Sequence, residues 1–289
     1  MHVIAPASSA NLGPGFDCLG LALDLPFELA DVQPDEPGFL LAEPTHPAVV
    51  AFVAAGGAAD ATLWWRSPIP PGRGLGFSGA ARVAGAYLAI QRGGVDHGAC
   101  RAGAMRVAAL LEGHADNAAA STFGGCTVAV GEQVVAVPVA DGLLEQLRVV
   151  VWSPAGSTST DASRRVLPEQ LPLVDATFSI GRAALWVAAL ASGELSMLRT
   201  ASQDRVHQPA RLAARPDTSA AYDAAMAAPA VLACWLSGSG PSIAALVRSD
   251  DDVGCAALVD ELTAVSGDEG RVRTLVVDVH GVRSLGPQG

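Results

Sequence analysis

Three glycines between residues 74 and 79 lie in a segment that could bind phosphate. The segment reads PPGRGLGFSGAA over residues 70–81 and leads into an apolar stretch with the i, i+4 repeat of a helix. Successive glycines let backbone N–H groups approach an anion, and a helix N-terminus adds unpaired donors and partial positive charge. Ser78 can cap that helix or bind a magnesium ion held by the phosphates. The alternative is a plain turn, with Gly79 and Gly85 present only for close helix packing.

The same glycines also match the G-x-G-x-x-G pattern of dinucleotide-binding folds. That pattern requires a strand that runs directly into the first glycine and an acidic residue at the end of the next strand. Here two prolines and Arg73 precede Gly74, and Asp96 lies in a glycine-flanked loop. All 18 basic residues are arginines, so the chain lacks the lysine of a Walker A loop, of a protein-kinase strand or of a Schiff base. We therefore interpret the segment as a phosphate loop that works without lysine.

Two further segments combine glycines with polar side chains. Residues 6–17 read PASSANLGPGFD, where Asn11 and Asp17 flank a turn whose glycines allow unusual backbone angles. Residues 236–242 read LSGSGPS and lie between two apolar runs. Each segment by itself is equally consistent with an ordinary turn whose side chains bond to their own backbone.

The composition restricts the class of protein. A net charge of −11 and a pI of about 4.9 argue against a nucleic-acid partner, because phosphate backbones attract basic surfaces. The five cysteines are scattered without a C-x-x-C pair, which argues against a disulfide framework or a zinc site. The first residues lack the pattern of a secretory signal, and no uninterrupted apolar run is long enough to cross a bilayer. We expect a cytoplasmic protein with a small-molecule substrate and no membrane partner.

The elements that position these segments mix helices and strands without a strict β-α-β rhythm. The patterns predict helices over 47–55, 78–92, 97–111, 159–166, 173–191, 218–227 and 251–265, and strands over 2–5, 27–32, 62–66, 126–130, 134–137, 147–152, 231–236, 242–247 and 272–279. The polar stretch SPAGSTSTDAS is the best candidate for a domain boundary. We predict an α+β protein with an N-terminal domain over 1–152 and a C-terminal domain over 153–289.

Together and in this order, these segments resemble the GHMP kinase superfamily (galactokinase, homoserine kinase, mevalonate kinase and phosphomevalonate kinase), and within it the homoserine kinases. The matching segments are PASSANLGPGFDCLGLALDL near the start, PPGRGLGFSGAA, EGHADNAAASTFGG at 112–125, FSIGRAAL at 178–185, DRVHQPAR at 204–211 and LSGSGPS. The resemblance spans nearly the whole chain. It implies a two-lobed fold with a ribosomal-protein-S5-like first lobe and a ferredoxin-like second lobe.

The resemblance also implies an activity. Such a protein would transfer a phosphoryl group from ATP, with Mg²⁺, to the side-chain hydroxyl of L-homoserine, as in threonine biosynthesis. Ser78 and Glu112 would hold the magnesium ion, and with Asn11 they would form the catalytic set. The residues matching the ATP phosphate loop are Gly74, Leu75, Gly76, Phe77, Ser78, Gly79 and Ala80.

The substrate pocket implied by the resemblance combines amide, acidic and basic side chains. Asn11 and Asp17 would meet the hydroxyl and ammonium ends of homoserine. The other pocket residues by the same match are His114 and Asn117 as lining and Arg182 and Arg211 as the clamp on the carboxylate.

The residues alone leave some of these roles open. Arg182 lies among apolar neighbours of a predicted helix, and a buried guanidinium needs an anion, which could be a substrate carboxylate or a structural one. His114 could equally be a plain structural histidine. Arg205 lies close enough to Arg211 in the sequence that either could contact the substrate.

The phosphate loop departs from the family's usual G-L-G-S-S-A-A. Phe77 replaces the first serine, and Gly79 replaces an alanine at a cost of about 1 kcal/mol if it is helical. The glycine would make room for the ring. Either the ring turns into the core and Ser78 suffices, or nucleotide binding is impaired.

Catalysis would rest on positioning. The acceptor hydroxyl would attack the γ-phosphate in line, with charge neutralised by loop amides, the helix N-terminus and magnesium; no lysine–aspartate base is identifiable. A kinase for another hydroxyl acceptor, such as L-threonine or an isoprenoid alcohol, is the first alternative, although two arginines and an acid favour a zwitterionic amino acid over mevalonate. A non-catalytic relative that binds a ligand or protein partner is the second. A homodimer is expected by analogy alone.

Overall fold

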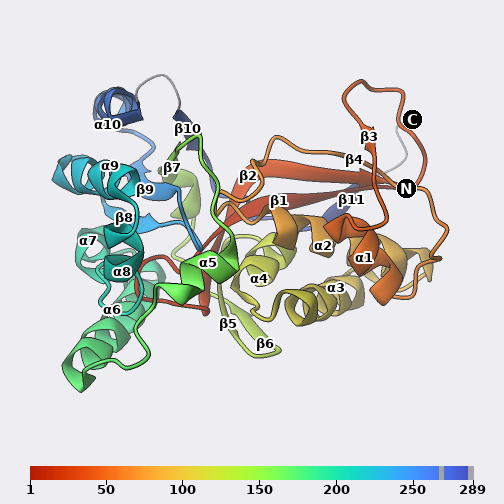
Figure 1. Ribbon diagram of the computed structural model, residues 1–289, viewed down its shortest axis with the longest axis horizontal. Coiled ribbons are helices and arrows are strands. Elements are labelled where there is room, and N and C mark those ends of the chain that lie inside the picture. Colours follow the sequence, from red (N-terminus) through yellow and green to blue (C-terminus); the bar gives the residue numbers. More distant parts are fainter. Residues whose placement is uncertain (267–269, 286–289) are drawn as a thin grey trace.

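Two β-sheets, each covered by helices, form two lobes in the computed structural model, which describes residues 1–266 and 270–285 (Figure 1). The seven-stranded sheet has the order β11-β1-β2-β4-β3, and β5 pairs with β2 and with β6. Its strands are β1 (His2–Ala10), β2 (Leu19–Ala30), β3 (Leu40–Leu41), β4 (Trp64–Arg66), β5 (Cys126–Val130), β6 (Gln133–Ala136) and β11 (Arg283–Leu285). Its helices are α1 (Pro47–Ala54), α2 (Phe77–Arg92), α3 (His97–Glu112) and α4 (Asp116–Phe123).

The four-stranded antiparallel sheet has the order β10-β7-β9-β8 and forms the second lobe. Its strands are β7 (Leu147–Ser153), β8 (Ala233–Leu236), β9 (Ile243–Arg248) and β10 (Arg271–Leu275). The α-helices of this half are α5 (Thr160–Arg165), α6 (Leu173–Ser192), α7 (Leu198–Ala201), α8 (Gln208–Ala213), α9 (Pro216–Ala227) and α10 (Asp252–Ser266), and short 3₁₀ turns occupy Leu144–Gln146 and Leu195–Met197.

One hydrophobic core continues from the first lobe into the second. Successive side chains of a strand point to opposite faces of its sheet. In β7, Val149 and Val151 pack into the core of the first lobe, whereas Val150 and Trp152 pack into a separate cluster with α9 and α10. The inner face of the second sheet is therefore built onto the first lobe, which fixes how the two lobes face each other.

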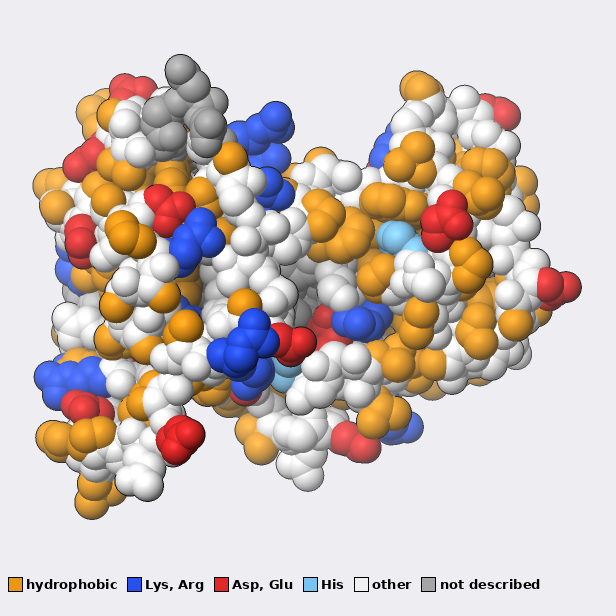
Figure 2. All heavy atoms as spheres, in the orientation of Figure 1, with side chains coloured by type: hydrophobic (Ala, Val, Ile, Leu, Met, Phe, Trp, Pro, Cys, Tyr) orange, Lys and Arg blue, Asp and Glu red, His pale blue; other side chains and the backbone are white. Residues whose placement is uncertain are grey.

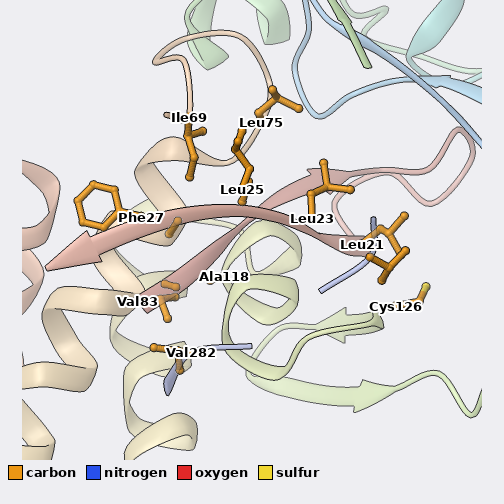
Figure 3. Close-up of a cluster of buried hydrophobic side chains, with 14 of the residues drawn as sticks. Leu21, Leu23, Leu25, Phe27, Ile69, Leu75, Val83, Ala118, Cys126 and Val282 are labelled. Atoms are coloured by element: carbon orange, nitrogen blue, oxygen red, sulfur yellow. The ribbon is translucent and has the colours of Figure 1, made fainter. Parts of the chain in front are cut away.

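The longest strand, β2, anchors the phosphate loop to this core. Figure 3 shows Leu23, Leu25 and Phe27 of β2 in one buried cluster with Leu75 of the loop and Val83 of α2. Leu75 is 1% exposed, so the loop is held by a buried side chain at its centre. Burial of a leucine contributes roughly 1.5–3 kcal/mol, which is large for a loop of this length.

Most predicted elements are present, and the fold class is confirmed as α+β. The main differences concern the first two strands, several short elements that were not predicted and the end of the last predicted strand. The strand predicted over 2–5 is too short, because β1 continues to Ala10 and pairs with β2 along its whole length, and the strand predicted from residue 27 begins at Leu19. The helix α4 was not predicted, since its sequence DNAAASTF has no apolar periodicity. The last predicted strand ends at Leu275 rather than at residue 279.

The lobes do not follow a single cut in the sequence. By sheet membership β7 belongs to the second lobe, although the predicted boundary follows residue 152. The segment after β10 returns to the first lobe, where β11 pairs with β1 and Val277 bridges to Leu23. A division at residue 152 stays a prediction of the sequence.

Helix α6 is unusually apolar for its position. Over the described residues it is the one helix whose length and composition would allow a membrane crossing, with 22% of its most apolar window buried. It also carries Asp175 and Arg182, and its C-terminal half packs Trp186 and Leu190 into the shared core.

The packing of α1 on α2 should depend on the absence of a side chain at Gly85. A Cβ atom there would lie 2.0 Å from the carbonyl oxygen of Ala48. We expect Gly85→Ala to lower the free energy of unfolding by about 1–3 kcal/mol through overpacking. Gly181→Ala is the matched control, because Gly181 is also helical and has nothing within 4 Å of the added atom. It should stabilise by about 0.5–1 kcal/mol. Urea unfolding measures both, and equal effects at the two sites would contradict the packing argument.

Candidate active site

The phosphate loop ends in a helix terminus with free donors. Gly74 and Gly76 adopt left-handed φ angles of 70° and 68°, which favour glycine. Gly76 is the N-cap of α2 and makes no side-chain hydrogen bond to it. The first backbone N–H groups of α2 are therefore without intrahelical partners, and their partial positive charge favours an anion.

The loop is held between β1 and the segment over residues 237–242. A Cβ atom on Gly74 would lie 2.1 Å from the Ser237 carbonyl oxygen, and one on Gly76 would lie 2.1 Å from Ser8 Oγ. Ser237 Oγ donates to the Gly74 carbonyl at 2.6 Å, and the Ser8 amide donates to the Leu75 carbonyl at 3.2 Å. Neither glycine can carry a side chain in this arrangement.

The first glycine segment joins the third through Asn11. The side-chain Nδ2 of Asn11 donates to the Gly238 carbonyl at 2.7 Å, and its Oδ1 accepts from the backbone N–H of Asp17 at 3.0 Å. Asn11 and Asp17 have φ angles of 72° and 55°, and Asn11 is 3% exposed. The Gly238 amide in turn donates to the Ala10 carbonyl at 3.1 Å. All three glycine segments predicted to cooperate thus lie against one another.

A cavity of about 360 Å³ opens beside this junction. Figure 2 shows the molecule hollowed between the two lobes, with acidic and basic side chains gathered at the floor of the hollow. The predicted site residues that line the cavity are Gly74, Leu75, Gly76, Phe77, Ser78, Gly79, Glu112, His114 and Asn117. The predicted residues outside its lining are Asn11, Asp17, Ala80, Arg182 and Arg211. Asp17 lines a neighbouring cavity of about 340 Å³, which shares His114 with the first.

Glu112 lies at the cavity with a partly satisfied carboxylate. Its side chain is 7% exposed, and Oε1 accepts from Nη1 of Arg82 at 2.6 Å. Burial raises the pKa of Glu112, and the Arg82 guanidinium opposes that rise. Oε2 is buried without a hydrogen-bond partner. Ser78 Oγ accepts from the same Nη1.

These two side chains fit a magnesium ion in a kinase. Mg²⁺ in such sites is bound by one or two protein oxygens and by substrate phosphates rather than by a full protein cage. Glu112 Oε2 offers an unpaired carboxylate oxygen, and Ser78 offers a hydroxyl beside the helix terminus. The described residues contain no group of three His, Cys, Asp or Glu side chains that could hold a metal ion.

His114 and Asn117 belong to a polar network at the start of α4. His114 Nδ1 and Asp116 Oδ1 are 2.8 Å apart, and this hydrogen bond raises the pKa of His114. Asn117 Oδ1 accepts from Ser8 Oγ at 3.0 Å and lies 3.1 Å from the position of a Cβ atom on Gly76. Asn117 thus lies close to Gly76 of the phosphate loop and also lines the cavity.

Arg164 is a cavity residue that the sequence did not reveal. Its Nη2 donates to Asp17 Oδ1 at 2.7 Å, so the predicted ammonium partner is itself paired. Arg164 lies at the end of α5, directly after the stretch interpreted as a domain boundary. The two residues are 147 positions apart in the sequence, and no local pattern signals their contact.

Arg211 lies behind the cavity wall, close to Asn11. It is 5% exposed, and its guanidinium donates to the Gly238 carbonyl at 3.2 Å and to His207 Nδ1 at 3.1 Å. Burial lowers the pKa of Arg211 to about 10, and the charge of Arg164 adds to the effect. A buried guanidinium beside a second one attracts an anion, as a carboxylate clamp requires.

Arg182 and Arg205 both stack on the ring of Phe178. Their guanidinium carbons lie 3.6 Å and 3.9 Å from the ring centroid. Nη1 of Arg205 donates to Asp175 at 3.1 Å, whereas Nε of Arg182 is buried without a hydrogen-bond partner. Of the two, Arg182 therefore has the unmet need for an acceptor.

Phe77 lines the cavity, and its ring packs in an aromatic cluster. Its centroid lies 5.6 Å from that of Phe27, 5.7 Å from that of Trp65 and 6.0 Å from that of His46, all at edge-to-face angles. The expectation that Gly79 makes room for this ring is wrong. A Cβ atom on Gly79 would lie 3.2 Å from Glu112 Oε2 and 3.2 Å from Asn117 Cβ, so the glycine makes room for those residues.

Arg82 is a second cavity residue that the sequence analysis did not identify. Its side chain is only 22% exposed and lines the cavity one turn after Ser78. The i, i+4 spacing from Ser78 was the available signal, because residues four apart share a helix face.

Comparisons with known proteins agree with this geometry. The GHMP kinases C terminal family model matches residues 186–257. The chain is 41% identical to a homoserine kinase of Thermus thermophilus over 289 residues, covering 96% of each chain. The chain belongs to the homoserine kinase family. It is also similar to the crystal structure of a homoserine kinase from Cytophaga hutchinsonii, with a TM-score of 0.81, 26% identity and 99% and 97% coverage of the two chains.

The wider superfamily shares the fold. A mevalonate kinase from Methanococcus jannaschii matches with a TM-score of 0.66 at 12% identity, covering 96% of this chain and 98% of that one. The predicted GHMP kinase fold and the assignment to an alcohol-acceptor kinase are confirmed by these matches.

A pH dependence of stability follows from His207. Its Nε2 lies 2.7 Å from the Gly13 carbonyl and its Nδ1 faces Arg211, so the neutral ring donates through Nε2 and accepts through Nδ1. Burial lowers the pKa of His207 to about 4, against 6.5 when unfolded. Between these values only the unfolded state binds the proton. Stability should therefore fall below about pH 6.5, by up to about 1.4 kcal/mol per pH unit.

Urea unfolding at several pH values tests this. His207→Gln should lose that part of the slope, whereas His280→Gln, at an exposed position, should keep it. An unchanged slope in the His207 variant would show that another group is responsible.

Substitution of Phe77 should affect stability rather than nucleotide binding. Phe77→Ser removes a ring packed on three others, so we expect a loss of about 2–3 kcal/mol in unfolding free energy. Phe77→Leu keeps an apolar side chain and should lose less than about 1.5 kcal/mol. Calorimetry with ADP should give similar affinities for both variants and the wild type. Tighter ADP binding by Phe77→Ser at unchanged stability would place the ring in the phosphate site.

Proposed function

We propose that this protein transfers the γ-phosphoryl group of ATP to the side-chain hydroxyl of L-homoserine. The observation that carries the proposal is the junction of the three glycine segments at one cavity. There the uncapped start of α2, Glu112 and Arg164 line one cavity, Asp17 pairs with Arg164 from the neighbouring cavity, and Arg211 lies behind the wall at Gly238. The 41% identity to a homoserine kinase over nearly the whole chain supports the same substrate.

The nucleotide phosphates would bind to the loop from Gly74 to Ala80. The left-handed glycines and the uncapped start of α2 supply backbone donors, and the dipole of α2 supplies partial positive charge without lysine. Ser78 and Glu112 would hold Mg²⁺, which would neutralise negative charge on the nucleotide phosphates when bound.

The amino-acid end of the substrate would bind on the far side of the cavity. Asp17 would receive the ammonium group, and the carboxylate would be bound by Arg211 and Arg182. Arg211 is a better candidate than Arg205, because it shares the Gly238 carbonyl with Asn11, whereas Arg205 is paired with Asp175 on α6. His114 and Asn117 would line the pocket between substrate and phosphates.

The chemical step balances without a dedicated base in this chain. The homoserine oxygen forms a bond to the γ-phosphorus as the bond from that phosphorus to the β,γ-bridging oxygen breaks, and ADP leaves with its charge neutralised. The hydroxyl proton passes to the transferred phosphoryl oxygens or to solvent. Asn11 positions the acceptor, and the rate gain comes from alignment and charge stabilisation.

The proposed cellular location, partners and oligomeric state rest on composition and on analogy. The acidic surface and the small cavity support a small-molecule substrate in the cytoplasm, with no nucleic acid and no membrane. A homodimer is proposed only by analogy with related kinases. L-Threonine remains the alternative acceptor, since it carries the same ammonium and carboxylate groups. The retained Glu112, Asp17 and phosphate loop argue against a non-catalytic relative.

A turnover assay with ATP and Mg²⁺ across L-homoserine, L-threonine, mevalonate and shikimate tests the acceptor. We expect ADP release with L-homoserine at the highest kcat/KM. Arg182→Ala should raise the KM for homoserine about 10- to 100-fold, as expected for a lost charged hydrogen bond, and leave the KM for ATP unchanged. Arg205→Ala is the matched control, because it removes the other guanidinium on Phe178.

Three outcomes would contradict parts of this proposal. Absence of turnover with every acceptor, together with absence of ATP binding in calorimetry, would refute the kinase. Equal effects of Arg182→Ala on both substrates would remove its carboxylate role. A homoserine-specific effect of Arg205→Ala alone would move that role to Arg205.

A further inference from the structure

One guanidinium nitrogen lies between the two side chains proposed to hold magnesium. Nη1 of Arg82 is 2.6 Å from Glu112 Oε1 and also donates to Ser78 Oγ. The positions of these three residues on α2 and α3 explain why their side chains are in contact. Ser78 and Arg82 are four residues apart on α2 and share one face, while Glu112 is the last residue of α3, which packs against α2.

Ser78 Oγ and the Glu112 carboxylate together form a site that binds a positive charge. Glu112 is 7% exposed, so its carboxylate requires a counter-charge. Gly79 allows the approach, because even a methyl group there would lie 3.2 Å from Glu112 Oε2. The positive charge of Arg82 thus lies where a carboxylate and a hydroxyl oxygen converge on the wall of the cavity.

A metal ion held by Ser78 Oγ and the Glu112 carboxylate would compete with Nη1, because Nη1 already contacts both side chains. Mg²⁺ binds oxygen at about 2.0–2.1 Å. Even an ion bound through Ser78 Oγ and the unpaired Oε2 of Glu112 would therefore lie within a few ångströms of the guanidinium, and the two positive charges would repel each other. Each cation thus weakens the binding of the other at Glu112.

We propose that Arg82 is a resident counter-ion at the metal position, and that it leaves Glu112 when the metal–nucleotide complex binds. This inference rests on the proposed function, because it takes Ser78 and Glu112 as the metal ligands. Arg82 competes with the metal and so sets the metal concentration that the enzyme requires. Glu112 is paired with a cation in both states, so a buried carboxylate is never left without one.

The ion pair between Arg82 and Glu112 has fewer hydrogen bonds than such a pair can form, which makes it easier to break. Arginine and carboxylate commonly form two parallel hydrogen bonds. Here the contact runs through Nη1 and Oε1, while Nε of Arg82 and Oε2 of Glu112 are buried without partners. Arg82 also lines the cavity, so a released guanidinium stays on the wall beside the phosphate loop.

Binding of Mn²⁺ in the presence of saturating ADP tests the competition without measuring turnover. Free Mn²⁺ is followed by electron paramagnetic resonance at about pH 8, where carboxylates are ionised. Arg82→Gln should bind Mn²⁺–ADP about tenfold more tightly than the wild type, because no ion pair has to be broken. Arg82→Lys keeps a cation and should stay close to the wild type. Arg106→Gln is the charge-matched control on α3, because Arg106 is 63% exposed, and it should bind like the wild type.

The outcomes separate this inference from the proposed function. If Glu112→Gln abolishes Mn²⁺ binding but Arg82→Gln leaves it unchanged or weaker, the competition is refuted and the metal site stands. If Glu112→Gln binds Mn²⁺ like the wild type, the metal assignment fails and the competition fails with it. Melting curves accompany each variant, and Arg82→Met, with an unbranched apolar side chain, replaces Arg82→Gln if the latter does not fold.

Discussion

The close approach of Gly74 to the Ser237 carbonyl is the contact on which the site depends. It brings the phosphate loop of the first lobe against the 237–242 segment of the second, at a distance that no side chain permits. The same segment binds Asn11 through Gly238, so the loop, the first turn and the second lobe are fixed together. The core that continues across both lobes packs beside this junction. Displacing it would separate the phosphate donors from the substrate side chains.

Charge at the site is arranged in compensated pairs. Glu112 faces Arg82, and Asp17 faces Arg164. Glu112 is buried, and loss of Arg82 alone would leave its charge uncompensated, so a group that displaces Arg82 must itself be a cation. The ammonium group of an amino acid can replace Arg164 at Asp17, and a metal can replace Arg82 at Glu112. Binding in both cases becomes an exchange of cations.

The phosphate loop differs from the family pattern at Phe77 and Gly79, and each of these residues contacts a different set of neighbours. Phe77 packs its ring against Phe27 and Trp65 at the edge of the cavity. Gly79 gives space to Glu112 and Asn117, which line the cavity beside the loop. The loop therefore keeps its donors while its side chains differ.

The sequence alone determined the fold class, most helices and strands, and the three glycine segments, because these depend on local periodicity and on residues whose backbone angles are special. It also indicated Glu112, Asp17 and Arg211 through the resemblance of short motifs. The tertiary structure decided which charges meet. Arg164 reaches Asp17 across 147 residues, and Arg82 reaches Glu112 across 30. No local pattern encodes such pairs, since they arise only when two lobes or two helices pack, and for this reason the counter-ion at the metal position emerged from the fold.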